Sequence, residues 1–284
     1  MDFNVVKAIA RRELSSYLGN PAGYVFLTLF IAATGAGAFL QEGFFARNLA
    51  DLALLNKVMP AILMLFVPAV TMGVWAQERR LGTDELLLTM PVRDTEVVLG
   101  KYFGALGVFT VGLGFSVAHV LVLRWLGQPD LGLMLSTYLG YWLIGATFVA
   151  IGLLASMFAG NATVAFILGA LGCAGMVFAG TEPWASGIVG CAVFAGLISL
   201  LWTAVQGNTE GAGLLGLIGA VVGVLVWLGG AWKGFEEAFG KLGVDQHFYG
   251  FGEGVVRLGD VVFFIGIAAV VLYLCVFMLG RRHW

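Results

Sequence analysis

Charged residues are scarce in this sequence. Only 11% of its 284 residues are Asp, Glu, Lys or Arg, whereas 60% are hydrophobic and the mean hydropathy is +0.95. Soluble domains carry about a quarter of charged residues, so the composition excludes an ordinary soluble domain. The net charge of −2 provides no basic excess for a nucleic-acid partner.

Cysteine is also rare, and its placement excludes further classes. Cys173, Cys191 and Cys275 lie far apart inside apolar stretches, as is typical of small buried hydrophobic residues. Their spacing suits neither a disulfide framework nor a metal site. The sequence also lacks a G-x-x-x-x-G-K-[ST] phosphate loop and an H-E-x-x-H zinc motif. We therefore expect no metal and no cofactor bound by this chain, and no ATP chemistry of its own.

Long uncharged stretches are present instead, and each crossing of a bilayer needs about 20 apolar residues. The uncharged run over residues 131–181 is too long for one crossing, and the turn-forming residues 160–163 divide it. We predict an all-α, polytopic integral membrane protein with eight spans. They lie near residues 21–40, 58–76, 102–123, 134–158, 163–180, 187–205, 214–232 and 261–279. The sixth and seventh are rich in glycine, so a re-entrant or peripheral arrangement is the alternative for these two.

The basic residues predict the orientation of the spans. Cytoplasmic loops carry an excess of Lys and Arg. With the N-terminus in the cytoplasm, nine basic residues are inside and six are outside. Because the span count is even, both termini lie on the same side. The sequence thus predicts a multi-pass membrane protein with cytoplasmic N- and C-termini.

Residues 1–20 precede the predicted transmembrane domain of residues 21–284 and have the pattern of an amphipathic helix. One face carries Phe3, Val6, Ile9, Ala10, Leu14 and Tyr17, and the other carries Lys7, Arg11, Arg12 and Ser15. Such a helix lies in the cytoplasmic interface with its cations among lipid headgroups. It serves either as a membrane-surface anchor or as a binding surface for a partner protein.

The loop over residues 77–101 holds nine of the chain's 32 charged residues. Gly82 ends the extension of the second span, and Thr83 is a good N-cap for a short helix with two acidic residues in its first turn. Three leucines follow before Pro91 ends this helix. Asp94 and Thr95 then cap a helix that leads into the third span. A capped helix with three leucines indicates a docking element rather than a solvated connector.

Two stretches resemble one family of membrane proteins. The first runs from Trp75 to Lys101 and reads WAQERRLGTDELLLTMPVRDTEVVLGK. It resembles the first cytoplasmic loop of ABC-2-type transporter permeases, most of all the subgroup that includes the gliding-motility-associated permease. The second runs from Leu242 to Phe264 and reads LGVDQHFYGFGEGVVRLGDVVFF. It resembles the external segment and last span of that subgroup. The likeness covers roughly residues 1–180 and 242–284 and implies a six-span core, to which residues 181–241 add two spans.

The resemblance implies a non-catalytic membrane subunit of an ATP-driven exporter. Such a permease forms the translocation pathway, pairs with a second permease copy as a homo- or heterodimer, and rests a coupling helix on a separate ATP-binding cassette ATPase, which binds ATP and Mg²⁺. Carried onto this sequence, the ATPase contact comprises Glu78, Arg79, Arg80, Gly82, Thr83, Asp84, Glu85, Leu86, Leu87 and Pro91. Relatives serve motility, polymer export and metal-centre assembly, so the resemblance does not select a substrate.

The segment over residues 233–260 is external in this orientation and is rich in aromatic residues. The resemblance implies that this region helps to gate the exit or meets an extracytoplasmic auxiliary protein, and the candidates for an external gate are Phe239, His247, Phe248 and Tyr249. An aromatic belt at the membrane interface explains the same residues, so both interpretations stay open.

Two other classes of protein compete with the permease. A secondary transporter or channel needs ionisable residues within its spans, and His119 is the candidate here. An intramembrane protease needs a nucleophile and a base. Ser116 and His119 share a helix face, but Ser116 lacks the second glycine of G-x-S-x-G. Ser186-Gly187 resembles part of a rhomboid motif, but Trp184 stands where the G-x-S-G pattern needs its first glycine. Membrane lipid is a partner in every case.

Overall fold

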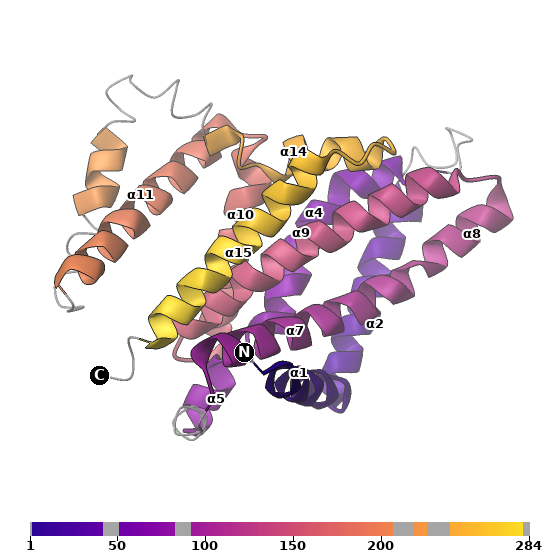
Figure 1. Ribbon diagram of the computed structural model, residues 1–284. Coiled ribbons are helices and arrows are strands. Elements are labelled where there is room, and N and C mark those ends of the chain that lie inside the picture. Colours follow the sequence, from indigo (N-terminus) through magenta and orange to yellow (C-terminus); the bar gives the residue numbers. More distant parts are fainter. Residues whose placement is uncertain (1, 42–50, 83–91, 207–217, 226–238, 281–284) are drawn as a thin grey trace. The chain divides into compact units, whose positions relative to one another are not determined.

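The computed structural model describes residues 2–41, 51–82, 92–206, 218–225 and 239–280, and its regular elements there are helices (Figure 1). They are α1 (Phe3–Leu18), α2 (Pro21–Phe39), α4 (Ala53–Thr71), α5 (Ala76–Leu81), α7 (Asp94–Ser116), α8 (Ala118–Leu126), α9 (Leu131–Phe158), α10 (Ala162–Ala179), α11 (Pro183–Gln206), α14 (Val244–Gly252) and α15 (Leu258–Gly280). The all-α prediction is confirmed for the described part of the chain.

The chain divides into two compact units. The first comprises Met1–Cys173 and His247–Trp284, and the second comprises Ala174–Gln246. In the second unit, Gly180 and Gly243 approach so closely that a Cβ on Gly243 would lie 2.3 Å from the Gly180 Cα. This contact brings the end of α10 and the start of α14 together within that unit.

Five helical segments of the described chain are long and apolar enough to cross a membrane. They run over Ala53–Leu81, Asp94–Leu126, Leu131–Phe158, Ala162–Ala179 and Leu258–Gly280. They coincide with the second, third, fourth, fifth and eighth predicted spans. A sixth crossing is added if α1 and α2, which meet at a 78° bend, are counted together. The predicted sixth span falls on α11, and most of the seventh lies outside the described residues, so the total of eight stays a prediction.

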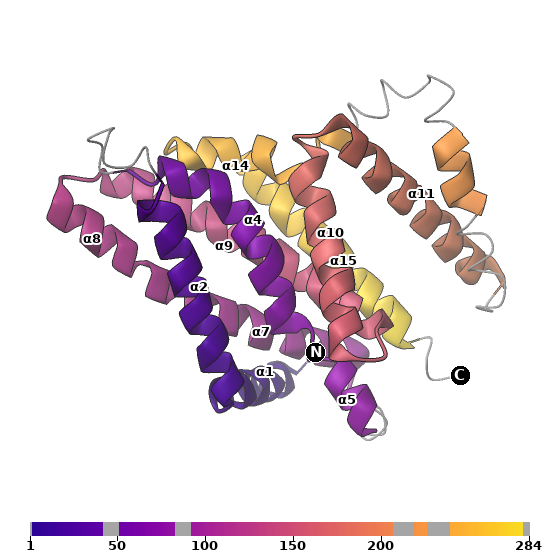
Figure 2. The same ribbon diagram turned by 180° about the vertical axis from the view of Figure 1, so that it is seen from behind.

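Helix α9 lies at the centre of the first unit and packs against α4, α7 and α15 (Figures 1 and 2). Its side chains Tyr141, Ile144 and Phe148 are fully buried. The Thr147 hydroxyl donates to the Phe264 carbonyl at 3.1 Å, which ties α9 to α15. Small and hydroxyl-bearing residues at such contacts are typical of helix packing in membranes.

Helix α4 contains Pro60 and Pro68 and ends at Thr71, after which four residues of turn lead into the short helix α5. Gly82 ends α5 with φ 67°, in the left-handed region that favours glycine. The prediction that Gly82 interrupts this helix is therefore confirmed. Because α5 ends at Gly82, it leads directly into the predicted coupling helix.

Helix α7 begins at Asp94, about two turns before the predicted start of the third span, and its cap differs from the prediction. The Glu96 carboxylate accepts a hydrogen bond from the Arg93 amide at 3.2 Å and another from the Asp2 amide at 2.6 Å. The prediction placed the cap at Asp94 and Thr95, whereas Arg93 is the N-cap residue and Glu96 bonds its amide as in a capping box. The same carboxylate also attaches the N-terminus of α1 to the start of α7.

Helix α1 lies against α7 because three glycines of α7 leave room for it. A Cβ on Gly100 would meet Ile9 at 2.7 Å, and one on Gly104 would meet Glu13 at 2.6 Å. Gly107 faces Leu14 in ordinary contact. One correction concerns the predicted apolar face, because Phe3 is 76% exposed and Glu13 takes part in the packed face instead. Whether α1 lies in the membrane interface stays a prediction.

Candidate functional site

Lys101 is the most unusual residue of the first unit, because its side chain is fully buried. Its ammonium contacts three acceptors, which are Glu78 Oε2 at 2.7 Å, the Val74 carbonyl at 2.9 Å and Glu13 Oε1 at 3.4 Å. It also lies 4.6 Å from the centre of the Trp75 ring. The ion pair with Glu78 and the hydrogen bonds to Val74 and Glu13 compensate the charge, as burial of a cation requires.

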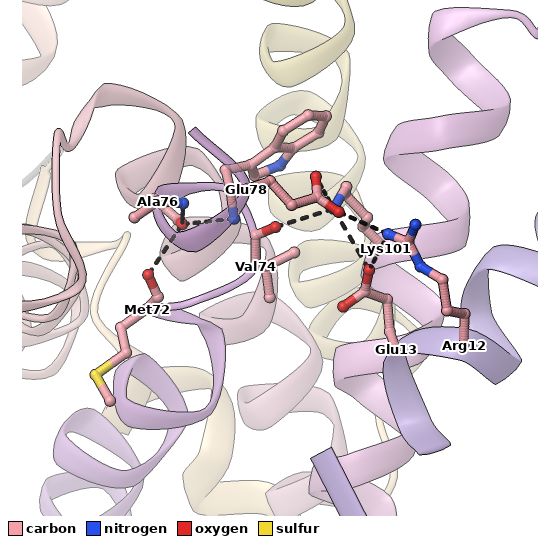
Figure 3. Close-up of polar contacts among 9 residues, drawn as sticks. Arg12, Glu13, Met72, Val74, Ala76, Glu78 and Lys101 are labelled. Atoms are coloured by element: carbon pink, nitrogen blue, oxygen red, sulfur yellow. Dashed lines mark hydrogen bonds and ion pairs between the residues drawn. The ribbon is translucent and has the colours of Figure 1, made fainter. Parts of the chain in front are cut away.

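Arg12 completes a charge cluster, by which we mean Arg12, Glu13, Glu78 and Lys101 (Figure 3). Its guanidinium contacts Glu78 Oε1 at 2.6 Å and Glu13 Oε1 at 2.9 Å. The hydrogen bond to Glu13 raises the pKa of Arg12 above its ordinary value. Two cations and two anions therefore alternate, and they come from α1, α5 and α7. The charge cluster connects these three helices.

The break between α4 and α5 is stabilised by one hydroxyl of α9. The Ser156 Oγ accepts from the amides of Trp75 at 3.0 Å and Ala76 at 3.2 Å. It also donates to the Met72 carbonyl at 3.2 Å. A helix leaves its first amides and last carbonyls without partners inside the helix. Ser156 supplies such partners on both sides of the break, while Lys101 bonds the Val74 carbonyl.

Arg79 attaches α5 to the end of α9. Its guanidinium donates to the Met157 carbonyl at 2.5 Å and to the Ala159 carbonyl at 3.1 Å. A cation at the C-terminus of a helix is favourable because the last carbonyls carry partial negative charge. Close by, Ala76 packs against Ala159 and Ala165 in a fully buried cluster. Helix α5 is thus held by α1, α7, α9 and the start of α10.

The predicted ATPase-contact residues divide into two groups in this structure. Glu78 and Arg79 point into the first unit and make the bonds described above, whereas Arg80 is exposed and Gly82 ends the helix. Thr83, Asp84, Glu85, Leu86, Leu87 and Pro91 lie outside the described residues. The structure therefore describes the attachment of the predicted coupling helix and not that helix itself.

Three residues of the site, Lys101, Ser156 and Glu13, were not predicted from the sequence. For Lys101 and Ser156 the sequence contains a pattern that could have indicated the role. Lys101 stands at the edge of a long apolar run, beside Gly100 and close to Gly104. Such a cation needs an anion, and the glycines indicate a close helix. Ser156 is a lone hydroxyl in an apolar stretch. Glu13 looked like an ordinary surface carboxylate, and no local pattern predicts its partner.

We expect Ser156→Ala to destabilise the protein by about 1–3 kcal/mol, because two buried amides would lose their acceptor. The measurement is thermal unfolding of the purified protein in detergent. Ser15→Ala is the matched control, since Ser15 is exposed on α1 and should change stability by less than about 0.5 kcal/mol. Equal unfolding temperatures for the two variants would contradict the role assigned to Ser156.

At the other end of the first unit, α14 packs on α9 through aromatic residues of the predicted external segment. Phe248 is buried and stacks on Tyr141 with ring centres 5.4 Å apart. The Phe251 carbonyl accepts from Ser136 Oγ at 2.8 Å and from Thr137 Oγ1 at 3.3 Å. The segment is therefore anchored to a central helix of the unit.

The four candidate gate residues occupy different environments. His247 Nδ1 lies 2.7 Å from Asp260 Oδ1, and its ring stacks on Phe263 at 3.7 Å. Phe248 points inward, whereas Tyr249 is 65% exposed. Phe239 belongs to the second unit. The role of these residues as a gate stays a prediction.

The residues behind the competing interpretations have other contacts. The Ser116 hydroxyl donates to the Leu113 carbonyl at 2.7 Å and lies 3.4 Å from the Tyr138 hydroxyl. His119 is 6% exposed, and its ring lies 5.8 Å from that of Phe39. The serine hydroxyl is thus engaged along its own helix and with α9, and the histidine packs between helices.

Comparison with known proteins identifies the family. Residues 24–229 match the sequence model of the family described as ABC-2 family transporter protein. The match covers well over half of the chain, beginning within α2 and extending past the end of α11. No curated protein matches the chain. Together with the apolar helices, the match shows that the chain belongs to the ABC-2 transporter family, as a multi-pass membrane subunit of an ATP-binding cassette transporter.

Proposed function

We propose that this chain is the permease subunit of an ATP-driven exporter, and that α5 transmits movement from an ATPase subunit to the spans. The ATPase is a separate chain with bound ATP and Mg²⁺, and it contacts the coupling helix predicted over Thr83–Met90. A second permease copy completes the translocation pathway. The resemblance of residues 75–101 and 242–264 favours the gliding-motility-associated subgroup, the bacterial inner membrane and cytoplasmic termini.

The observation that carries this proposal is the attachment of α5. The helix is six residues long, and residues at its start and in its middle contact other helices. Ser156 bonds its first amides, Arg79 bonds the end of α9, and Glu78 bonds Lys101 and Arg12. A short helix held in this way moves as one body with its neighbours. A displacement applied just after Gly82 is therefore passed to α1, α7 and α9.

Such coupling is a shift between access states. The ATPase favours one state only if its contact with the permease differs between the two. The charge cluster and the Ser156 bonds make α5 stiff, so that the difference in contact reaches the spans instead of being absorbed by a loose loop. The external segment packs on α9 through Phe248, so a movement of α9 would also displace this segment.

The experiment is co-purification of the permease with its ATP-binding subunit. Glu85→Arg, and separately Leu86→Ser with Leu87→Ser, should weaken the complex while expression and membrane insertion stay normal. A charge left facing a like charge in an interface costs about 2–5 kcal/mol, so recovery of the ATPase should fall by tens of times or more. Substrate-stimulated ATP hydrolysis should be lost in parallel.

Glu253→Arg is the matched control, because Glu253 is exposed in the external segment. The same reversal of charge there should leave co-purification unchanged. Retention of the ATPase at normal levels by both coupling-helix variants would show that residues 83–90 are only a connector. It would also show that α5 does not transmit movement from the ATPase, although the contacts that hold α5 would remain.

A further inference from the structure

A cavity of about 140 Å³ lies where α1, α2 and the end of α4 meet. One side of it is polar and is lined by Glu13, Ser16, Asn20 and Gln77. The other side is apolar and includes Phe26, Ala69, Val70 and Met72. A site with hydrogen-bonding groups on one side and apolar groups on the other fits an amphipathic molecule.

The apolar side continues along α2 and α4. A smaller cavity of about 20 Å³ shares Tyr17, Phe26 and Val70 with the first and is otherwise lined by apolar residues, among them Phe30 and Phe66. Together the two cavities present polar groups near the end of α1 and aromatic rings further along α2. This order matches the order of headgroup and acyl chain in a lipid.

Tyr17 lines both cavities, and its hydroxyl is buried with no hydrogen-bond partner among the described residues. A buried polar group without a partner costs about 1–3 kcal/mol. Burial raises the pKa of Tyr17 to about 12, so the hydroxyl stays protonated and can donate. This hydroxyl is the second, independent indication that a polar group of a ligand belongs here.

The depth of the cavity follows from the bend between its helices. Helices α1 and α2 meet at 78°, so α1 runs across the membrane surface when α2 crosses it. Asn20 lies between the two helices, so in that arrangement it would be at the level where headgroups meet acyl chains. Glu13 is the one charged residue in the lining. Arg12 and Lys101 both contact its Oε1, so its other oxygen, Oε2, is the acceptor left for a cationic group of a ligand.

We propose that this cavity binds the headgroup of a phosphatidylethanolamine-type lipid of the adjacent leaflet, with the first part of an acyl chain along α2 and α4. The ammonium donates to the Glu13 carboxylate and to the amide oxygens of Asn20 and Gln77. The phosphate accepts from the Tyr17 hydroxyl and from Ser16. A choline headgroup lacks the N–H donors, and a glycerol headgroup leaves the lipid anionic. The site therefore selects by headgroup.

The test uses the purified full chain, stripped of lipid in detergent and then mixed with equal amounts of phosphatidylethanolamine, phosphatidylcholine and phosphatidylglycerol. Native mass spectrometry measures which lipid stays bound. We expect a preference for phosphatidylethanolamine of about three- to tenfold, set by its ammonium. Tyr17→Phe should lower the retention of phosphatidylethanolamine by a similar factor, because one hydrogen bond to the phosphate is worth about this factor. Tyr24→Phe is the control, since Tyr24 is 59% exposed on α2 and does not line the cavity.

A second readout separates lipid binding from a structural role of Tyr17. A ligand that binds only the folded protein raises its unfolding temperature. Phosphatidylethanolamine should stabilise the unaltered protein and Tyr24→Phe, but not Tyr17→Phe. Without lipid, Tyr17→Phe should be as stable as the unaltered protein, because its hydroxyl has no partner there. Equal retention of all three lipids, a preference for phosphatidylglycerol, or unchanged retention of phosphatidylethanolamine by Tyr17→Phe would each overturn the proposal.

Discussion

Lys101→Met should destabilise the protein by about 3–5 kcal/mol, because it leaves the partners of a buried ion pair without their cation. Glu78 and Glu13 would face each other near the N-terminal part of α7, and the Val74 carbonyl would lose its hydrogen-bond donor. Arg12 also contacts both carboxylates, but 54% of its side chain is exposed. An exposed pair contributes no more than about 1 kcal/mol, so Arg12 cannot replace the lysine.

The measurement is thermal unfolding in detergent, followed by ATP hydrolysis of the complex with the ATPase subunit. Arg12→Met is the matched control and should cost less than about 1 kcal/mol. Adding Glu78→Gln to Lys101→Met removes one orphaned charge, so the double variant should recover part of the loss. If Lys101→Met is no more destabilising than Arg12→Met, the buried pair does not hold α5 and α7 together.

Gly104→Leu should detach α1 from α7. A Cβ at this position would lie 2.6 Å from the Glu13 Cβ and 3.1 Å from the Ala10 carbonyl oxygen. Neither atom is the free end of a flexible side chain, so the whole helix must move. Overpacking of this kind costs about 1–3 kcal/mol. Displacement of α1 would also pull Glu13 away from Lys101 and Arg12 away from Glu78, which adds to the loss.

Trypsin measures this detachment directly, because α1 carries Arg11 and Arg12. Cleavage there should be faster in Gly104→Leu than in the unaltered protein, since a detached helix opens more often. Gly114→Leu is the control on the same helix, where a Cβ would meet nothing within 4 Å. Equal cleavage rates in the two leucine variants would show that the glycine contact does not hold α1 in place.

Much of the helical architecture follows from the sequence alone. The predicted second, third, fourth, fifth and eighth spans coincide with described helices, because crossing a membrane is a requirement on about 20 consecutive residues and leaves a local pattern. Gly82 was also recognisable, because a glycine after a charged helical turn favours the left-handed end of a helix. The start of α9 was less accurate, because Asp130 caps this helix at Leu131, before the predicted start of the fourth span at residue 134. Helix α7 begins at Asp94, where the sequence predicts a helix that leads into the third span.

The attachment of α5 was decided by tertiary structure. Lys101 and Glu13 are 88 residues apart, and no local sequence pattern around either residue predicts the other as its partner. They meet because Gly100 and Gly104 admit α1 to the surface of α7. The orphaned amides and carbonyls at the α4–α5 break likewise select Ser156 and Lys101 only after α7 and α9 have packed beside them. Apolar run length sets which segments are helices, whereas the pairing of buried charges depends on which helices come close enough to replace water.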